Sequence, residues 1–515
     1  MLLSLLFPRA PKISGGMGAS QPGSGRDHPW RTRIAVALAL LGGVGGLGAA
    51  WLNRGTTIPQ KAPVIREARY AMTPFGDVAV YAPDDQPRAT VLLLSGDQGW
   101  NGGMERIARA LAARDILVAG VSTPTFMRNM ERSSAYCINP NYPLMALAGD
   151  VQHRMAVRSY MKPIIMGYSS GATIAYASLA QWPNGSYRGV FSLGFSPDTP
   201  GRKPWCHEPG FATHRSGLDQ KDWIFAPNPK IKLPWFVIQG GADRVVDFGA
   251  ARAFAAKVPR AVFLPQPTLT HDFSDHLSWF ASLDAALEPM LAPEPGISAD
   301  AALQDLPINV VPNKVVAGAP ADVMAVIYSG DGGWVGIDRD VAGQIASQGI
   351  PVVGIDSLSY FWSARTPAGA AHDLARMIRF YGEKWKRPRI MLVGYSFGAN
   401  ALPAIISSLD PATRTQIKSL ALLGLGPTSD FQFHVGSWLD MASAQAKPTV
   451  PAVEQLKGLD IICIRGAEES DSACPQIPSA IASMITVPGG HHFDRNASLL
   501  ARLILRTSSS PIAKR

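Results

Sequence analysis

The sequence predicts an α/β protein that contains two copies of one domain plan behind an N-terminal apolar segment. Short apolar runs alternate along the chain with patterns of helical period, which is typical of parallel sheets covered by helices. Three motifs occur twice in the same order, and one of them is G-x-S-x-G. Of the 515 residues, 47% are hydrophobic and 17% are charged, and this balance excludes a disordered chain.

The formal net charge of +9 is concentrated at the N-terminus. Residues 1–55 hold six Arg and Lys side chains and one Asp, so they carry five of the nine charges. The rest of the chain is nearly neutral, whereas a nucleic-acid-binding protein needs a basic surface. We therefore expect no nucleic-acid partner, and we assign the basic head (1–55) to targeting.

Residues 34–52 form an uncharged run of 19 residues that follows Arg26, Arg31 and Arg33. Such a run is just long enough to span a bilayer as a helix. The basic flank favours the cytoplasmic side, so the rest of the chain is predicted to be exported. Small residues up to Ala50 also permit cleavage. A signal peptide and an uncleaved signal anchor both stay open.

The four cysteines suit an exported protein. Cys137 and Cys206 fall in the first half of the chain, and Cys463 and Cys474 fall in the second. Of the three possible connectivities, pairing within each half is the simplest, and four free buried thiols are the alternative. The sequence has no Cys or His spacing that is typical of a metal site, so we expect no metal.

The internal repeat covers a whole domain. VLLLSGDQGW (91–100) returns as AVIYSGDGGW (325–334), IIMGYSSGATIAY (164–176) returns as IMLVGYSFGANAL (390–402), and FVIQGGAD (236–243) returns as IICIRGAEE (461–469). The order is unchanged and the offsets lie between 226 and 234 residues, which indicates a duplication. We predict domains at 60–291 and 301–507, joined by the Pro- and Gly-rich linker 292–300.

Each copy is predicted to form a mostly parallel sheet that is flanked by helices. In the second copy the strand candidates are 324–328, 351–355, 390–393, 419–423, 460–464 and 484–487, with helical patterns at 368–383 and 399–408. These strands lack charged residues almost entirely, as expected when helices cover both faces of the sheet.

Two G-x-S-x-G motifs, Gly167–Gly171 and Gly394–Gly398, each lie between a strand candidate and a helix that is rich in small residues. This strand–turn–helix context is that of a nucleophile elbow, in which a strained turn exposes the serine above the sheet. Cβ atoms at the glycine positions would clash with the neighbouring strand and helix. The two motifs therefore predict the α/β-hydrolase fold in both copies, with Ser169 and Ser396 as nucleophiles.

A serine hydroxyl needs a base, and the base needs an orienting acid; on this fold the chain order is serine, acid, histidine. The first copy supplies Ser169, Asp243 and His271 in that order. A relic of the duplication that has lost its activity is the alternative for this second possible triad.

The second copy supplies Ser396, then Glu469 or Asp471, then His491. The interval from the serine to the acid favours Glu469, whereas the fold more often uses Asp, so both acids stay open. His492 competes with His491, which a His-x-Phe pattern shared by the two copies favours.

The oxyanion hole is expected to combine the N–H after the nucleophile with an N–H from the loop after an early strand. In the second copy these groups are Phe397 and the loop that contains Gly330, Asp331 and Gly332. Asp331 is expected either to contact a cationic substrate group or to cap its own loop.

Five segments together resemble the VirJ/AcvB family of bacterial virulence proteins: SGDGGW, SLSYFW (357–362), GYSFGAN, the loop between Cys463 and Cys474, and GGHHFD. The resemblance implies a periplasmic or inner-membrane α/β-hydrolase, with Ser396, His491 and Glu469 or Asp471 as its site. The AcvB type is associated with hydrolysis of lysyl-phosphatidylglycerol, and the family with virulence and type IV secretion. The first copy departs from the pattern, because Ser170 stands where the second copy has Phe397.

From the residues and the resemblance we expect a periplasmic serine esterase that cleaves the aminoacyl ester of an aminoacylated phospholipid at the inner membrane. Such a reaction requires no metal and no cofactor. A non-catalytic accessory or chaperone of type IV secretion on a hydrolase scaffold is one alternative, and a general lipase or esterase is another.

Overall fold

The computed structural model describes residues 63–183, 187–208, 210–216, 220–273, 277–291, 301–433 and 445–507. The predicted signal or anchor segment (34–52) and the predicted linker (292–300) lie outside these residues. Among the helices of the described residues, none is both long enough and apolar enough to cross a membrane.

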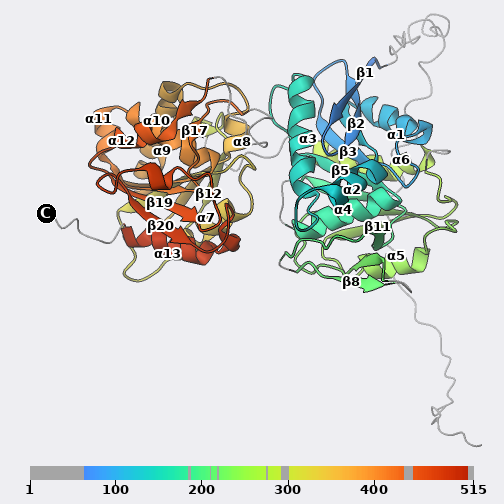
Figure 1. Ribbon diagram of the computed structural model, residues 1–515. Helices are drawn as coiled ribbons and strands as arrows, with labels where there is room; N and C mark the ends of the chain where they lie inside the picture. The colour runs from blue at the N-terminus through green and yellow to red at the C-terminus, as the bar shows by residue number, and fades with distance from the viewer. Residues whose placement is uncertain are drawn as a thin grey trace, which may run out of the picture. The chain divides into compact units, whose positions relative to one another are not determined.

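The described residues form two large, mostly parallel sheets, each flanked by helices, which confirms the predicted fold class (Figure 1). We call residues 63–291 the first half and residues 301–507 the second half. The domain boundaries drawn from the sequence stay a prediction.

The first half contains an eight-stranded sheet in the order β1-β2-β4-β3-β5-β6-β10-β11. β1 and β2 are antiparallel to their neighbours and the other pairs are parallel. The strands are β1 (Ile65–Met72), β2 (Gly76–Pro83), β3 (Ala89–Leu94), β4 (Ile116–Val121), β5 (Ile164–Tyr168), β6 (Gly189–Leu193), β10 (Trp235–Gly240) and β11 (Ala261–Gln266). The helices are α1 (Gly102–Ala112), α2 (Thr123–Arg132), α3 (Asn141–Arg154), α4 (Ser170–Gln181), α5 (Phe248–Ala255), η1 (Leu277–Trp279) and α6 (Phe280–Leu291). Between β6 and β10 the chain forms a small antiparallel sheet from β7 (Asp198–Pro200), β8 (Thr213–Ser216) and β9 (Asp222–Phe225).

The second half contains a seven-stranded sheet in the order β12-β14-β13-β15-β16-β19-β20, in which only β12 is antiparallel. The strands are β12 (Ile308–Val311), β13 (Val323–Tyr328), β14 (Val352–Ile355), β15 (Arg389–Tyr395), β16 (Ile417–Leu423), β19 (Asp460–Gly466) and β20 (Ser483–Val487), with a short pair β17 (Thr428–Ser429) and β18 (Lys447–Pro448). The helices are η2 (Ala301–Leu303), α7 (Ile337–Ser347), α8 (Ser357–Tyr360), α9 (Pro367–Trp385), α10 (Phe397–Ser407), α11 (Pro411–Thr415), α12 (Thr449–Glu454), η4 (Cys474–Gln476), η5 (Phe493–Arg495) and α13 (Ala497–Thr507).

The six strands predicted in the second half are all present, and their observed ends lie within two residues of the predicted ones. Both named helical patterns also form helices, as α9 and α10. β12 was not among the predicted strands; it runs antiparallel to β14 at the edge of the sheet.

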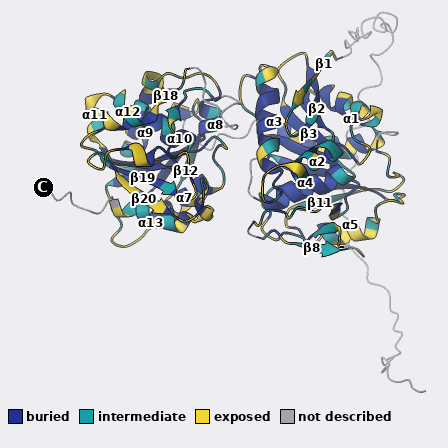
Figure 2. Cartoon of the chain, in the orientation of Figure 1, coloured by how far each residue is buried: buried dark blue, intermediate teal, exposed yellow. Residues whose placement is uncertain are grey.

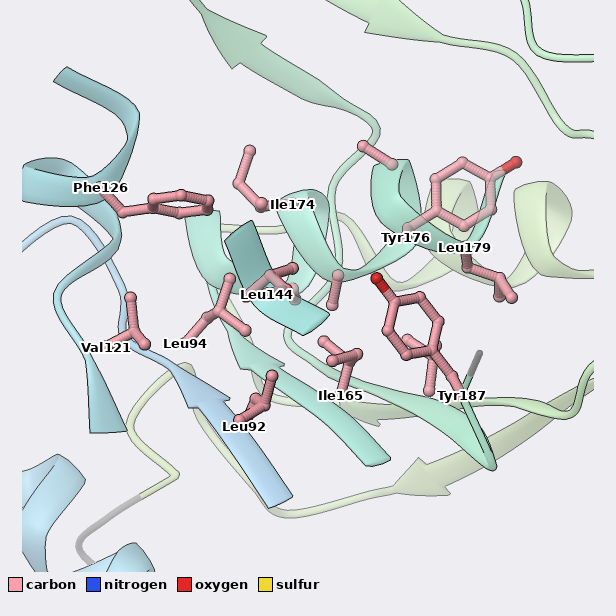
Figure 3. Close-up of a cluster of buried hydrophobic side chains, with 14 of the residues drawn as sticks. Leu92, Leu94, Val121, Phe126, Leu144, Ile165, Ile174, Tyr176, Leu179 and Tyr187 are labelled. Atoms are coloured by element: carbon pink, nitrogen blue, oxygen red, sulfur yellow. The ribbon is translucent and has the colours of Figure 1, made fainter. Parts of the chain in front are cut away.

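Each sheet buries both of its faces, because successive side chains of a strand point to opposite sides. On β13, Met324, Val326 and Tyr328 join one apolar cluster with α9 and α10, while the alternate residues join another with α7 and α13. The inner strands, such as β3, β4, β13 and β14, are accordingly buried along their length, whereas the edge strands β1, β11 and β20 carry exposed residues, as do the outer helix surfaces and loops (Figure 2). In the first half the corresponding core is built from strands β3 and β5 and helix α4, represented by Leu92, Ile165 and Ile174 (Figure 3).

The cysteines pair within each half, as predicted. Cys137 bonds Cys206, and Cys463 bonds Cys474; no free cysteine is found among the described residues.

Trp334 of the repeated SGDGGW motif is a packing residue. Its ring lies on Gly354 of the neighbouring strand β14, in the space that a Cβ at that position would take. Trp100 lies on Gly120 of β4 in the same way. The repeat of Trp in both motifs therefore reflects the same packing on a glycine of the neighbouring strand.

Replacing Gly354 by alanine is expected to lower the free energy of unfolding by about 1–3 kcal/mol, because the added methyl overlaps the Trp334 ring in a packed core. Gly343→Ala is the matched control: Gly343 lies on helix α7, and a Cβ there meets no atom within 4 Å. The Gly343→Ala variant should raise the free energy of unfolding by about 0.5–1 kcal/mol. Urea unfolding of both variants measures the difference, and equal stabilities would contradict this packing.

Candidate active site

Both predicted elbows adopt a strained turn between a strand and a helix. Ser169 has φ 52° and ψ −120° between β5 and α4, and Ser396 has φ 50° and ψ −116° between β15 and α10. Positive φ is costly for a residue with a side chain and is often found at functional positions.

The glycines of the motif are required by close backbone contacts. A Cβ on Gly398 would overlap the carbonyl of Tyr328 on β13, and a Cβ on Gly394 would lie 2.7 Å from the backbone of Ala399. The turn can therefore form only where glycine lies two residues before and two residues after the serine. Because the serine immediately precedes a helix, the unpaired N–H groups of the first turn lie next to its hydroxyl.

In the first half the three predicted residues form a complete hydrogen-bonded triad. His271 Nε2 lies 3.1 Å from Ser169 Oγ, and His271 Nδ1 lies 2.8 Å from Asp243 Oδ2. The Asp243 side chain is fully buried and that of His271 is 17% exposed. With the imidazole proton on Nδ1, His271 donates to Asp243 and can accept the Ser169 proton.

The Asp243 carboxylate is held by three further donors. Its Oδ1 accepts from the backbone N–H groups of Val245 (2.8 Å) and Val246 (3.0 Å), and its Oδ2 accepts from Gln239 Nε2 (3.2 Å). These bonds satisfy a buried charge and fix the acid in one orientation.

In the second half Glu469, and not Asp471, pairs with the histidine. Glu469 Oε1 lies 2.5 Å from His491 Nδ1, and its Oε2 accepts from the Gly466 backbone N–H at 2.6 Å. The Glu469 side chain is 3% exposed. Asp471 is exposed and affects His491 only through its charge.

His491 occupies the place of the base, and His492 has another role. His492 Nδ1 lies 2.7 Å from the hydroxyl of Tyr395. Unlike the first half, the second half shows no hydrogen bond between Ser396 and His491 among its described residues. Apo sites often have loose catalytic contacts that tighten when substrate binds.

Several charges act on the His491 imidazole. Burial lowers its pKa, but the hydrogen bond and charge of Glu469, together with the charges of Asp331 and Asp471, raise the pKa above its usual value. The neutral base therefore forms at a higher pH than in a free histidine.

The predicted oxyanion loop lies beside the nucleophile. A Cβ on Gly330 would sit 3.4 Å from Cβ of Ser396, so the loop backbone passes directly over the serine. Phe397 is the first residue of α10, and its N–H has no partner within the helix. Gly332 is exposed, and the nearest side chain to it is Val335, so it lies farther from the serine than Gly330.

Asp338 is a site residue that the sequence did not reveal. It lies in the first turn of α7, is 5% exposed, and one of its oxygens has no hydrogen-bond partner among the described residues. Burial raises its pKa well above the usual value, against hydrogen bonds from the backbone of Gly330 and of Asp338 itself. The carboxyl therefore helps to position the Gly330 loop.

In each half a tyrosine hydroxyl holds the backbone of the histidine. The hydroxyl of Tyr168 donates to the backbone oxygen of His271 (3.0 Å), and that of Tyr395 to the backbone oxygen of His491 (3.4 Å). The sequence contains a signal for this contact, because a tyrosine directly precedes the serine in both elbows.

Glycine after β6 and β16 makes room for the imidazole. Gly194 and Gly424 both have positive φ, and a Cβ on either would contact the histidine Cε1, at 3.1 Å from His271 and 2.7 Å from His491. The repeated Leu-Gly pairs at these positions are the signal that could have identified them.

The Tyr360–Trp362 segment of the SLSYFW motif is packed in its first two residues. Tyr360 donates to Asp373 Oδ2 at 2.7 Å, and Phe361 packs on Phe397 with ring centroids 5.1 Å apart.

The described residues hold no group of three or more His, Cys, Asp or Glu that is placed to bind a metal ion.

Known proteins resemble parts of the chain. A family model described as "Bacterial virulence protein (VirJ)" matches residues 322–511. No curated protein matches the sequence.

Three solved structures illustrate the structural likeness. A cold-adapted esterase from an Arctic intertidal metagenomic library has 13% identity and a TM-score of 0.32, covering 45% of this chain and 95% of that one. S-formylglutathione hydrolase from Staphylococcus aureus has 14% identity and a TM-score of 0.31, covering 44% and 96%. An α/β serine hydrolase without a lid from Xanthomonas campestris has 17% identity and a TM-score of 0.29, covering 45% and 97%. The resemblance to the VirJ family predicted from the sequence is confirmed over residues 322–511, the segment that contains Ser396, Glu469 and His491.

Proposed function

We propose that the second half is a serine esterase that hydrolyses the aminoacyl ester of an aminoacylated phosphatidylglycerol, with lysyl-phosphatidylglycerol as the first substrate to test. The observation that carries this proposal is the buried Glu469–His491 pair beside a serine in elbow geometry. The VirJ match over the same residues supports it.

In the proposed reaction Ser396 Oγ attacks the ester carbonyl while His491 Nε2 takes its proton. The developing oxyanion is stabilised by the Phe397 N–H and an N–H of the Gly330 loop. His491 then gives the proton to the departing glycerol oxygen, which leaves the aminoacyl group on Ser396. Water activated by His491 releases the amino acid and restores the serine.

The charge around His491 supports a cationic substrate group. Glu469, Asp331 and Asp471 all raise the pKa of His491, so three carboxylates act on the site as negative charges. A positively charged lysyl group is attracted by such charges, whereas an anionic acyl group is repelled.

We propose that the protein acts at the periplasmic face of the bacterial inner membrane. The two disulfides support an oxidising compartment, and the apolar segment 34–52 with its basic flank supports export or anchoring. A membrane anchor would hold the enzyme beside its lipid substrate. Components of type IV secretion are proposed partners on the strength of the family resemblance alone.

The full chain, added to phosphatidylglycerol vesicles that contain lysyl-phosphatidylglycerol, is expected to release free lysine. Vesicles in which the lysyl amino groups are acetylated keep the ester and lose the charge, so they should be hydrolysed more slowly. Amino-acid analysis of the supernatant measures both rates. Absence of lysine release by folded protein would refute the esterase proposal, and a Ser396 that a fluorophosphonate probe leaves unlabelled would favour the non-catalytic secretion role.

A further inference from the structure

We propose that the first half is a second, independent serine hydrolase, in which Ser169, His271 and Asp243 cleave a carboxylic ester with an uncharged acyl group. The VirJ match does not extend to this half, since it begins at residue 322. The proposal goes beyond the function proposed for Ser396 and does not depend on it.

The geometry of the first site is that of a working triad. The Ser169–His271 and His271–Asp243 contacts are both within hydrogen-bond range, at 3.1 and 2.8 Å. A serine that had lost its role would gain nothing from its strained φ of 52°, nor from a buried acid aimed at the histidine. These costly features persist together, which argues against a relic.

The oxyanion donors are also in place. A Cβ on Gly96 would lie 3.2 Å from Cβ of Ser169, so the loop after β3 passes over the nucleophile as the Gly330 loop does in the second half. Ser170 is the first residue of α4, and its N–H has no partner within the helix. The replacement of Phe397 by Ser170 leaves this backbone donor unchanged.

The proposed step is an ordinary acyl transfer. Ser169 Oγ forms a bond to the acyl carbon, and its proton passes through His271 Nε2 to the alcohol oxygen as the ester bond breaks. Water then attacks the acyl-serine, gives a proton back to Ser169 through His271, and releases the carboxylic acid.

The surroundings of the two acids differ, and this difference assigns different substrates. In the repeat, Arg244 and Val245 follow Asp243 where Ser470 and Asp471 follow Glu469. Val245 is 72% exposed, so an apolar side chain replaces a carboxylate at the surface beside the site.

A second acid is also missing from the first half. Met104 stands at the position that corresponds to the buried Asp338, four residues after the tryptophan of the repeated motif. Asp338 is buried with a raised pKa, and Asp272 follows His271 where His492 follows His491, so the difference in charge rests on Arg244 and Val245. The added arginine and the exposed valine favour an uncharged acyl chain at the first site.

The segment between the fourth and fifth parallel strands differs as well. In the first half it holds the β7–β9–β8 sheet, and Thr173 on the first turn of α4 donates to Ser196 at its start (2.7 Å). In the second half the equivalent segment holds β17, β18 and α12. In the first half this segment therefore contacts the start of the helix that follows Ser169, and its different structure in the second half leads us to expect different substrates.

Labelling with a biotinylated fluorophosphonate tests the proposal directly. The Ser396→Ala chain is expected to take up about one label, on the peptide that contains Ser169, as identified by mass spectrometry. Ser169→Ala in the same background should remove the label, while Ser134→Ala, which alters an exposed serine of the same half, should retain it.

Turnover provides the second measurement. The Ser396→Ala chain should hydrolyse p-nitrophenyl butyrate, and His271→Gln should lower that rate by about 10³-fold or more. His372→Gln replaces an exposed histidine on α9 and should leave the rate unchanged. Ser169→Ala should leave lysyl-phosphatidylglycerol hydrolysis unchanged. The two proposed activities are therefore tested independently, and failure of one does not hide failure of the other. A folded Ser396→Ala chain, verified by circular dichroism, that neither takes the label nor turns over the butyrate would overturn the proposal.

Discussion

Replacing Ser396 by alanine is expected to lower kcat/KM for lysyl-phosphatidylglycerol by roughly 10⁴- to 10⁶-fold, because the variant lacks the hydroxyl that is proposed to form the acyl-enzyme. The oxyanion donors and the binding surface remain, so a small residual acceleration over water is expected. Release of lysine from vesicles at several protein concentrations measures the loss.

Ser408→Ala is the matched control for this substitution. Ser408 is an exposed serine just after helix α10, and its hydroxyl only caps the helix by donating to Ala404. That variant should retain full activity. If Ser396→Ala kept the wild-type rate while Ser169→Ala abolished it, the two sites would have to exchange their proposed substrates.

Replacing Glu469 by glutamine is expected to lower kcat by about 10³- to 10⁴-fold and to move the pH profile. The amide no longer orients and stabilises the imidazolium that forms when His491 accepts the serine proton. Glu469 also raises the pKa of His491 against the effect of burial. Its removal should therefore lower that pKa.

The sign of the pH effect follows from the requirement for a neutral base. Activity falls as pH decreases through the pKa of His491, and this acid limb should lie at lower pH in Glu469→Gln than in the wild type. A plot of log kcat/KM against pH measures it. Asp471→Asn removes an exposed carboxylate that acts on His491 only through its charge, so it should shift the limb slightly and leave the maximal rate nearly unchanged. A loss in Asp471→Asn as large as in Glu469→Gln would show that the acid is misassigned.

The repeat and the elbow glycines made the architecture and the positions of both elbow serines predictable. The strands of the second half are short apolar runs almost without charges, and the turn around Ser396 requires glycine at positions 394 and 398 for steric reasons alone. Such local constraints are written directly in the sequence.

The choice between neighbouring residues was not predictable, because it depends on how a loop turns. Glu469 and Asp471 are two residues apart, but β19 ends at Gly466 and the following turn buries the first and exposes the second. The choice between His491 and His492 also depends on the loop, because the His492 imidazole hydrogen-bonds the Tyr395 hydroxyl while His491 faces Glu469.

Asp338 illustrates a contact that no local pattern contains. In the sequence it is one of two acids at the start of a helix, a common position for a solvated carboxylate. Only the packing of α7 against β13 and β14 buries it beside the Gly330 loop. Side chains that act on a site through the backbone of another segment escape prediction for this reason.

The Cys463–Cys474 bond has a consequence for the acid that it encloses. Glu469 lies inside the covalent ring that this bond closes, whereas Asp243 is restrained by its own set of hydrogen bonds. Glutamate has one more rotatable bond than aspartate, and the ring limits how far its backbone can carry the carboxylate away from His491. Oxidation of Cys463 and Cys474 thereby restrains the loop backbone that holds Glu469 beside His491.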